Sequence, residues 1–289
     1  MIETRAQKDA VTVDVILPTH RHWQTIGCSI ESVLRQTHAD LRLHVVGDGC
    51  TAEVEKAVRA IEDARVYFYA LPKAKGYGYA NRNHVLRQGA APYVAYVTDD
   101  DLWFPDHLER ALANLESGLD LIALRPCSAQ FPDRLEVHFF AFDWGRGLRR
   151  NPLRNWFIGS PELVHRRSVL DAVGYWNAEL SRFGDRDFYN RSRRSGVRSA
   201  YVDCTTVIRF YAQHWEDRYS ALDPPPQRDY LARLGDPEWC RRVRSLAEER
   251  RRPLAVRLRQ WRDFLRFGLS SGPKLARYSL QTIRGGASR

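Results

Sequence analysis

The stretch at residues 94–105, VAYVTDDDLWFP, decides the fold of this chain. It begins with a short apolar run that is typical of a buried strand. The run ends in three consecutive carboxylates, and Pro105 then indicates the start of a helix. Ligands of open α/β sheets bind at the carboxyl ends of the strands, which is where these acids fall. The stretch therefore predicts an α/β fold with a ligand site at one edge of the sheet.

The acids Asp99, Asp100 and Asp101 repel one another when all three are ionised. A divalent cation would relieve that repulsion, because Mg²⁺ and Mn²⁺ take oxygen ligands and share them with substrate phosphates. The alternative is a solvated acidic turn that caps the helix beginning near Pro105. An isolated triplet would favour the turn, whereas the rest of this sequence favours the metal.

Strands and helices alternate through the first half of the chain, which predicts a mostly parallel sheet flanked by helices, whereas the second half is less regular. A run of prolines at 224–226 marks an expected boundary. Strands are expected at 11–17, 41–46, 65–70, 93–97, 119–124, 137–142 and 201–210, and helices at 24–36, 52–61, 80–88, 168–173 and 187–195.

The net charge of +10 is unevenly distributed. Residues 241–289 hold fourteen Lys/Arg and three Asp/Glu, a net of +11 that leaves −1 for residues 1–240. Basic character therefore belongs to the tail, which argues against a nucleic-acid-binding body and for a tail with its own partner.

The five cysteines are odd in number, widely spaced and without a Cys-x-x-Cys motif. This usage argues against a disulfide framework or a zinc site and favours a reducing compartment. The first residues, MIETRA, show no apolar signal core, and no stretch approaches the ~18 apolar residues that span a bilayer. We expect a cytoplasmic protein whose only membrane contact is peripheral, at the inner face.

Polar loops follow the predicted strands at residues 18–21, 47–49 and 99–101. A parallel sheet gathers such loops along one edge. A fourth segment, 73–78, precedes a helix that carries Arg82, and its cations and the helix N-terminus would suit a diphosphate. Taken singly, residues 47–49 are an ordinary Asp-Gly turn and 73–78 a flexible surface loop.

The chain resembles glycosyltransferase family 2 enzymes with the GT-A fold, over about residues 11–215. Each matching segment is short, and their order and spacing carry the resemblance. The segments are 15–19 (VILPT), 29–37 (SIESVLRQT), 45–50 (VVGDGC), Gly76 with 80–83 (ANRN), 98–105 (TDDDLWFP), 173–176 (VGYW) and 184–188 (GDRDF).

The resemblance implies a donor site for a nucleotide-diphosphate sugar. Pro18 and Thr19 would line the base pocket, and Asp48 matches the acid that contacts the base, usually uracil. Arg82 matches the family arginine near the diphosphate, and Asp99 would lie near the ribose.

The acidic triplet matches the metal-binding Asp-x-Asp region of the family, and Mn²⁺ or Mg²⁺ is the implied cofactor. Alignment on the Leu-Trp-x-Pro segment that follows makes Thr98 replace the first family aspartate and Asp100 the metal ligand. If the triplet itself is the Asp-x-Asp, Asp101 is the ligand instead. His214 is a weaker candidate ligand, because a lone histidine is more often a structural hydrogen-bonding group.

The resemblance implies that Asp185 is the catalytic base. The family often has Glu-Asp here, and Gly184 replaces the first of the two. A base at a helix N-terminus is expected to stay ionised because the helix dipole favours negative charge. The alternative for Asp185 is a helix N-cap, and Asp187 is expected to pair with a nearby arginine.

Aromatic residues offer a further choice between a substrate role and a structural one. Trp144 and Trp176 would stack on a sugar face if they were exposed. Large aromatics are more often part of the core.

The basic tail contains an amphipathic pattern at residues 254–269, with apolar residues at three- and four-residue steps and arginines between them. Such a helix suits an anionic membrane surface. The alternative is that its apolar stripe docks on the protein's own body or on a second subunit.

These observations predict a GT-A domain at 1–220, with a nucleotide-binding half at 11–101 and an acceptor-side half at 102–220. A basic helical extension is predicted at 221–289. The implied activity is an inverting, metal-dependent hexosyl transfer from a UDP-sugar to a carbohydrate or lipid-linked saccharide acceptor, in polysaccharide or glycoconjugate synthesis.

Two other functions stay open at this point. A nucleotidyltransferase on a related sheet would need a glycine-rich loop after the first strand, and residues 18–22 lack those glycines. A catalytically silent binding or assembly module is the other, because Thr98 and Gly184 each replace a family acid.

Overall fold

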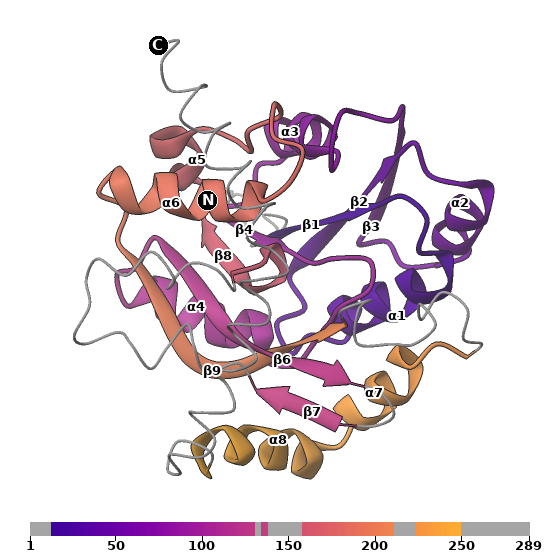
Figure 1. The fold of residues 1–289 in the computed structure, drawn as a ribbon, viewed down its shortest axis with the longest axis vertical. Coiled ribbons are helices and arrows are strands. Elements are labelled where there is room, and N and C mark those ends of the chain that lie inside the picture. Colours follow the sequence, from indigo (N-terminus) through magenta and orange to yellow (C-terminus); the bar gives the residue numbers. More distant parts are fainter. Residues whose placement is uncertain (1–12, 131–133, 138–157, 211–223, 250–289) are drawn as a thin grey trace, which may run out of the picture.

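A nine-stranded sheet runs through the described part of the chain, with helices on both of its faces (Figure 1). The computed structural model describes residues 13–130, 134–137, 158–210 and 224–249. The strand order is β3-β2-β1-β4-β8-β6-β9-β5, and β7 pairs with β6 off this path.

The first half of the sheet is parallel, as the alternation predicted. Each strand is followed by a helix that carries the chain back across the sheet, which is how parallel neighbours are joined. The elements are β1 (Val13–Thr19), α1 (Trp23–Leu34), β2 (Leu41–Asp48), α2 (Ala52–Arg59), β3 (Val66–Leu71), α3 (Tyr79–Gln88) and β4 (Tyr93–Tyr96).

The second half is mixed rather than mostly parallel. Here β4–β8, β8–β6, β6–β7 and β9–β5 are antiparallel pairs, and β6–β9 is parallel. The elements are β5 (Leu102–Trp103), α4 (His107–Glu116), β6 (Leu121–Gln130), β7 (Arg134–Val137), β8 (Leu163–Arg166), α5 (Ser168–Val173), α6 (Gly184–Arg194) and β9 (Ser199–Phe210).

Several predicted boundaries differ from those observed. The strand expected at 119–124 runs on to Gln130. The helix expected near Pro105 begins at His107, after Leu102 and Trp103 have formed a strand that pairs with β9. The helix expected at residue 187 begins three residues earlier, at Gly184. Most of the strand expected at 137–142 lies outside the described residues.

Two further helices, α7 (Gln227–Leu234) and α8 (Pro237–Glu249), follow the proline run. Their apolar residues, among them Tyr230, Leu231 and Val243, share one hydrophobic cluster with Phe104 and Ile208 of the sheet region. Residues 224–249 therefore pack on the same body as the sheet. The domain division predicted at residue 220 stays a prediction, and residues 254–269 lie outside the described residues.

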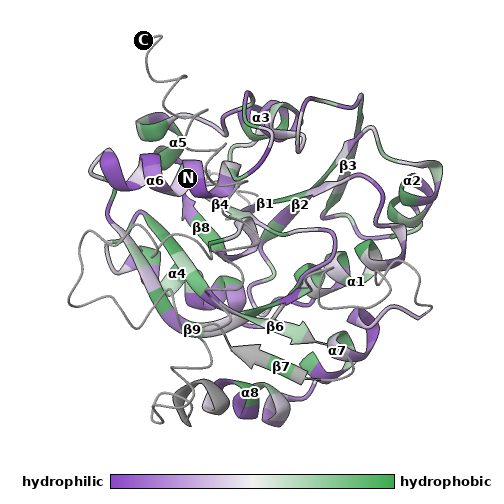
Figure 2. Cartoon of the chain, in the orientation of Figure 1, coloured by the Kyte–Doolittle hydropathy of each residue, from purple (hydrophilic) through white to green (hydrophobic). Residues whose placement is uncertain are grey.

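Helix α6 differs from the other helices in being hydrophilic over most of its length (Figure 2). It nevertheless buries Phe188 in the cluster that also holds Trp176, Tyr96 and Tyr79. Thus α6 is held by a few large aromatic contacts, which leaves its first turn to carry polar residues.

A buried ion network fixes the sheet at the edge opposite the acidic triplet. Asp14 is 1% exposed and accepts hydrogen bonds from the Ala91 amide (3.1 Å) and from the guanidinium of Arg167 (2.5 Å). Its other oxygen lies 2.9 Å from Nε2 of His44. The network joins β1 and β2 to the segment before α5, so it is a structural counterpart to the site at the other edge.

We expect Asp14→Asn to lower the free energy of unfolding by about 3 kcal/mol, because it leaves a largely buried arginine charge without its partner. Urea unfolding measures the change. The matched control is Glu31→Gln, which removes an exposed pair with Arg35 and should cost at most about 1 kcal/mol. Equal losses in the two variants would contradict the assignment of Asp14 as a structural anchor.

Candidate active site

The sheet brings the predicted donor-site residues to one edge. Thr19 ends β1 in register with Gly47 of β2, and Asp48 ends β2. The acidic triplet follows β4, which pairs with β1 on its other side. The loops predicted to meet at the carboxyl ends of the strands are therefore neighbours.

Thr19 and His20 present buried polar atoms at this edge that make no hydrogen bond to the part of the chain that the structure describes. Thr19 is 3% exposed, and its hydroxyl has no hydrogen-bond partner among the described residues. The same is true of the buried Nδ1 atom of His20. Pro18, half-buried beside them, is paired with Val46. Since buried polar groups are normally satisfied, these atoms are suited to a bound ligand.

Asp48 is 5% exposed and organises the loop at residues 72–78. One oxygen accepts from the Ala74 amide (2.7 Å) and from the Asn81 side chain (2.7 Å), and the other forms an ion pair with Lys73. Gly78, at φ +71°, lies so close that a Cβ there would be 2.7 Å from this carboxylate. Lys73 and Asn81 were missed as partners of Asp48, although both belong to the segment that the sequence placed near the diphosphate.

Each outer acid of the triplet has a cationic protein partner. Asp99 lies 3.0 Å from Nδ1 of His22, and Asp101 lies 3.1 Å from Nε of Arg209. The hydrogen bond from Asp99 raises the pKa of His22 to about 9, so this imidazole is positively charged at neutral pH. The protein itself thus relieves part of the repulsion that the sequence assigned wholly to a metal.

Asp101 and Asp100 have different surroundings. Asp101 is 2% exposed, and its oxygens accept from the Phe210 amide (2.9 Å) and from the Thr98 hydroxyl. Burial raises the pKa of the Asp101 carboxyl, against the lowering effect of Arg209. Asp100 is half-buried, and its backbone carbonyl accepts from the Gln227 side chain (3.1 Å). Of the two candidate metal ligands, Asp101 is the more buried, and its carboxylate contacts the Phe210 amide and Arg209.

Arg209 joins the triplet to a second buried acid, Glu162. Nη1 of Arg209 donates to Glu162 (2.7 Å), and the other oxygen of Glu162 accepts from the Gly159 amide (2.7 Å). Glu162 is 1% exposed, and burial raises its pKa to about 7. Sequence reasoning missed both residues, because nothing in their local pattern marks them.

Asp185 lies in the first turn of α6 and is half-buried. Burial raises the pKa of its carboxyl, and the Arg186 amide, Arg209 and Arg82 act in the opposite direction. Desolvation thus opposes the ionisation that the helix N-terminus was expected to favour, and that expectation stays a prediction. The N-cap alternative was wrong, since Phe183 precedes the helix and Asp185 lies in its first turn, where it accepts from the Arg186 amide (2.8 Å).

Gly184 is explained by Tyr79. The Gly184 amide donates to the Tyr79 hydroxyl (2.9 Å), and a Cβ at Gly184 would lie 2.5 Å from the tyrosine ring. The ring thus occupies the place where a family acid would begin its side chain. Burial raises the pKa of Tyr79 to about 12, so the hydroxyl stays protonated and can accept this bond with a lone pair.

Arg82 is 8% exposed and lies over the rings of Tyr79 (4.8 Å) and Trp176 (5.6 Å). Burial lowers the pKa of its guanidinium, whereas Asp185 and Asp99 act to raise it. Its Nε has no hydrogen-bond partner among the described residues. Arg82 is therefore a largely buried cation that interacts electrostatically with Asp185 on one side and Asp99 on the other.

Two structural alternatives from the sequence are confirmed. Trp176 is 2% exposed and stacks on Phe188, so it belongs to the core and does not face a sugar. Asp187 pairs with Arg191 at 2.8 Å, as expected for a structural acid. Trp144 and His214 lie outside the described residues.

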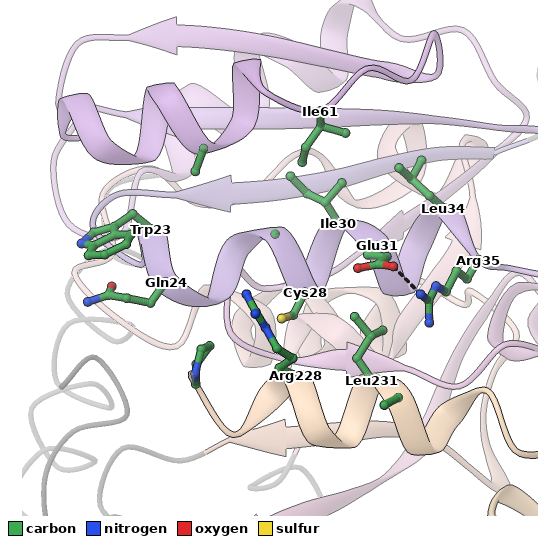
Figure 3. Close-up of a pocket in the computed structure, with 14 residues that line it drawn as sticks. Trp23, Gln24, Cys28, Ile30, Glu31, Leu34, Arg35, Ile61, Arg228 and Leu231 are labelled. Carbon is green, nitrogen blue, oxygen red and sulfur yellow. Dashed lines mark hydrogen bonds and ion pairs between the residues drawn. The ribbon is translucent and has the colours of Figure 1, made fainter. Parts of the chain in front are cut away.

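A groove of about 740 Å³ lies apart from these residues, between α1 and α7 (Figure 3). Trp23, which is 47% exposed, stands at one end of it, and its walls are mainly apolar. None of the predicted site residues lines it.

No cluster of three or more metal-binding side chains occurs within the residues described. Magnesium sites that share substrate phosphates commonly use only one or two carboxylates, so the acids present fit such a shared site. In the same part of the chain, no helix combines the length and apolar character needed to cross a membrane.

Residues 14–173, more than half of the chain, match the family model described as Glycosyl transferase family 2. This chain belongs to glycosyl transferase family 2. One relative is UDP-Glc:alpha-D-GlcNAc-diphosphoundecaprenol beta-1,3-glucosyltransferase WfgD of Escherichia coli. The two sequences are 31% identical over 105 residues, which cover 36% of this chain and 41% of that enzyme. The chain thus spans less than half the length of that relative. An uncharacterized glycosyltransferase of Bacillus subtilis, YwdF, is 22% identical, covering 78% of this chain and 83% of that protein.

Solved glycosyltransferase structures share the fold of this family 2 chain. S. aureus TarS 1–349 in complex with UDP superposes with a TM-score of 0.59 at 18% identity, covering 77% of this chain and 64% of that one. Mannosyltransferase PcManGT from Pyrobaculum calidifontis, in complex with GDP-Man and Mn²⁺, gives 0.53 at 18% identity, covering 91% and 80%. The GT-A fold expected from the sequence is confirmed.

We expect Gly184→Ala to cost about 1–3 kcal/mol of unfolding free energy, the range for inserting a methyl group into a packed site. The new Cβ collides with the Tyr79 ring and displaces the first turn of α6. Gly27→Ala is the matched control, since Gly27 is also helical but has nothing within 4 Å of its Cβ position. That control should gain about 0.5–1 kcal/mol from helix propensity. Urea unfolding that shows a gain in both variants would refute the role of Tyr79.

Proposed function

We propose that this protein is an inverting glycosyltransferase that moves a sugar from a nucleotide-diphosphate donor to an acceptor hydroxyl. The observation that carries the proposal is the placement of Asp185 beside two arginine charges that also reach the acidic triplet. Arg82 interacts electrostatically with Asp185 and Asp99, and Arg209 with Asp185 and Asp101. These charges are the ones that a proton acceptor, a leaving diphosphate and a bound metal would need, which supports the proposal.

The names of similar proteins support a nucleotide-sugar donor and favour uracil. The E. coli relative is named for UDP-Glc, and TarS has been solved with UDP and with UDP-GlcNAc. The Pyrobaculum enzyme was solved with GDP-Man, so guanine is the competing base. Pro18, Thr19 and Asp48 would form the base pocket, with Asp99 near the ribose.

Asp100 would hold a divalent cation, Mn²⁺ or Mg²⁺, together with the donor diphosphate. Bound there, the cation would neutralise charge on the diphosphate as it leaves. Asp101, committed to Arg209 and the Phe210 amide, would support that position from the interior. The Mn²⁺ in the Pyrobaculum enzyme's complex supports this choice of metal.

Asp185 would act as the general base. Its raised pKa would make the carboxylate a better proton acceptor, while Arg82 and Arg209, which act to lower that pKa, would favour the ionised form before the acceptor arrives. The acceptor oxygen would lose its proton to Asp185 as it attacks the anomeric carbon opposite the diphosphate, which inverts the stereochemistry. Arg82 would stabilise the negative charge that develops on the leaving group.

Neither replacement of a family acid argues for a catalytically silent module. Thr98 donates its hydroxyl to Asp101, and Gly184 makes room for Tyr79. Each replacement has a structural partner, and Asp48, Asp100 and Asp185 are retained. The nucleotidyltransferase alternative finds no support in the loop after β1, which lacks glycine.

The acceptor we propose is a carbohydrate or a lipid-linked saccharide, in polysaccharide or glycoconjugate synthesis. The E. coli relative is named for a diphosphoundecaprenol-linked acceptor, which supports the lipid-linked class. Residues 254–269 would place the protein at an anionic membrane surface on the cytoplasmic side, and this contact stays a prediction.

Calorimetric titration with UDP, GDP and dTDP, each with Mn²⁺, Mg²⁺ or a chelator, tests this function. We expect UDP to bind in the presence of metal, and Asp100→Ala to weaken metal-dependent binding at least about 10-fold. Asp185→Asn should bind UDP as the wild type does but release no UDP from UDP-sugars, because it lacks the base.

The control for nonspecific loss of binding is Asp187→Asn, which removes a structural acid of the same helix turn. It should bind UDP normally at a temperature where it is folded. If no nucleotide binds to the wild type under any metal condition, the enzyme function is refuted and the silent-module alternative gains.

A further inference from the structure

Arg209 is held in one orientation by contacts on three sides. Asp101 lies 3.1 Å from its Nε, and Glu162 lies 2.7 Å from its Nη1. Gly159 lies beneath the guanidinium, so closely that a Cβ there would be 1.9 Å from Nη1. The contact with Asp101 is an ion pair, whereas Nη1 donates a hydrogen bond to Glu162. Because a guanidinium is planar and its donors have fixed directions, the bond to Glu162 and the backbone at Gly159 orient the group.

Glu162 connects all parts of this arrangement. One of its oxygens holds Arg209, and the other holds the amide of Gly159, the residue on which Arg209 rests. Glu162 ends a short 3₁₀ turn (Ser160–Glu162) whose Pro161 carbonyl accepts the indole N–H of Trp103 at 3.0 Å. Trp103 belongs to β5, the strand that directly follows Asp101, so the turn is tied to the segment beside the acids.

Burying a carboxylate costs free energy unless it is paired, and Glu162 is 1% exposed. Burial raises its pKa to about 7 even beside Arg209, so keeping this carboxylate ionised in the interior lowers the stability of the fold. A neutral side chain would avoid the cost. The cost is understandable if the acid serves the site.

We propose that Glu162 is a positioning residue of the transfer reaction, which fixes the Arg209 charge between Asp101 and the base Asp185. This inference rests on the proposed glycosyl transfer. Arg209 lies 3.1 Å from Asp101 and also acts electrostatically on Asp185. A displaced Arg209 would leave Asp101 without this contact and move a positive charge away from Asp185, so the chemical step would suffer more than donor binding.

The experiment measures release of UDP or GDP from UDP-glucose, UDP-GlcNAc and GDP-mannose with Mn²⁺, with water as acceptor. Glu162→Gln removes the charge with little change in shape. Gly159→Ala keeps every charge but pushes Arg209 aside, so it tests the inference even if Glu162→Gln does not fold. For both variants we expect kcat to fall about 10- to 100-fold, as for loss of a supporting residue, with the donor KM within about 3-fold.

The double variant Glu162→Gln/Gly159→Ala shows whether the two substitutions act through the same displacement of Arg209 or lower kcat independently. If both changes act by displacing Arg209, combining them should lower kcat no further than about 3-fold below the worse single variant. Asp14→Asn is the control for a loss of kcat caused only by lower stability. It removes a buried acid that pairs with Arg167 at the opposite edge of the sheet. That variant should lose stability while keeping kcat within about 2-fold of wild type, because it does not touch the site.

The outcomes distinguish the inference from the function on which it rests. Wild-type turnover with kcat unchanged in both single variants would overturn the inference alone, as would fully multiplicative losses in the double variant. Wild type that releases no nucleotide from any of the three donors would overturn the proposed function, and the inference with it.

Discussion

One guanidinium sets the electrostatics of the catalytic edge. Arg209 contacts Asp101 and Glu162 directly and acts on Asp185 at longer range. Without that cation, three crowded carboxyl groups would each take up protons more readily, since burial already raises the pKa of all three. In the proposed mechanism, the acids serve a metal and a base in one small site because a fixed positive charge lies among them.

Close backbone approach is the second constraint, and glycine meets it twice at this edge. Gly159 lets the chain pass against the Arg209 guanidinium, and Gly184 lets α6 begin against the Tyr79 ring. Because neither glycine has a side chain, Arg209 and Tyr79 can pack directly against the backbone. The Cβ of an acid at position 184 would lie 2.5 Å from the Tyr79 ring, so a change at one position requires the other to move.

The parallel half of the sheet was predictable because its signals agree. Strand runs, helical spacing and glycine turns all indicate the same elements from Val13 to Tyr96. Strand β8 was missed because it is four residues long and includes His165, whose burial depends on Tyr96 across the sheet. Asp48 and Asp185 were found beside element ends, whereas Glu162 and Arg209 meet across 47 residues of sequence, where no local pattern reaches.

The central proposal is that Asp100 holds the metal together with the donor diphosphate, while Asp101 stays in the interior on Arg209 and the Phe210 amide. The most direct test is a crystal structure of the protein with UDP and Mn²⁺, with the manganese located by its anomalous scattering. The account predicts manganese bound to the Asp100 carboxylate and the diphosphate, with Asp101 still on Arg209 and the Phe210 amide. Manganese bound to Asp101, with Arg209 turned away, would contradict it.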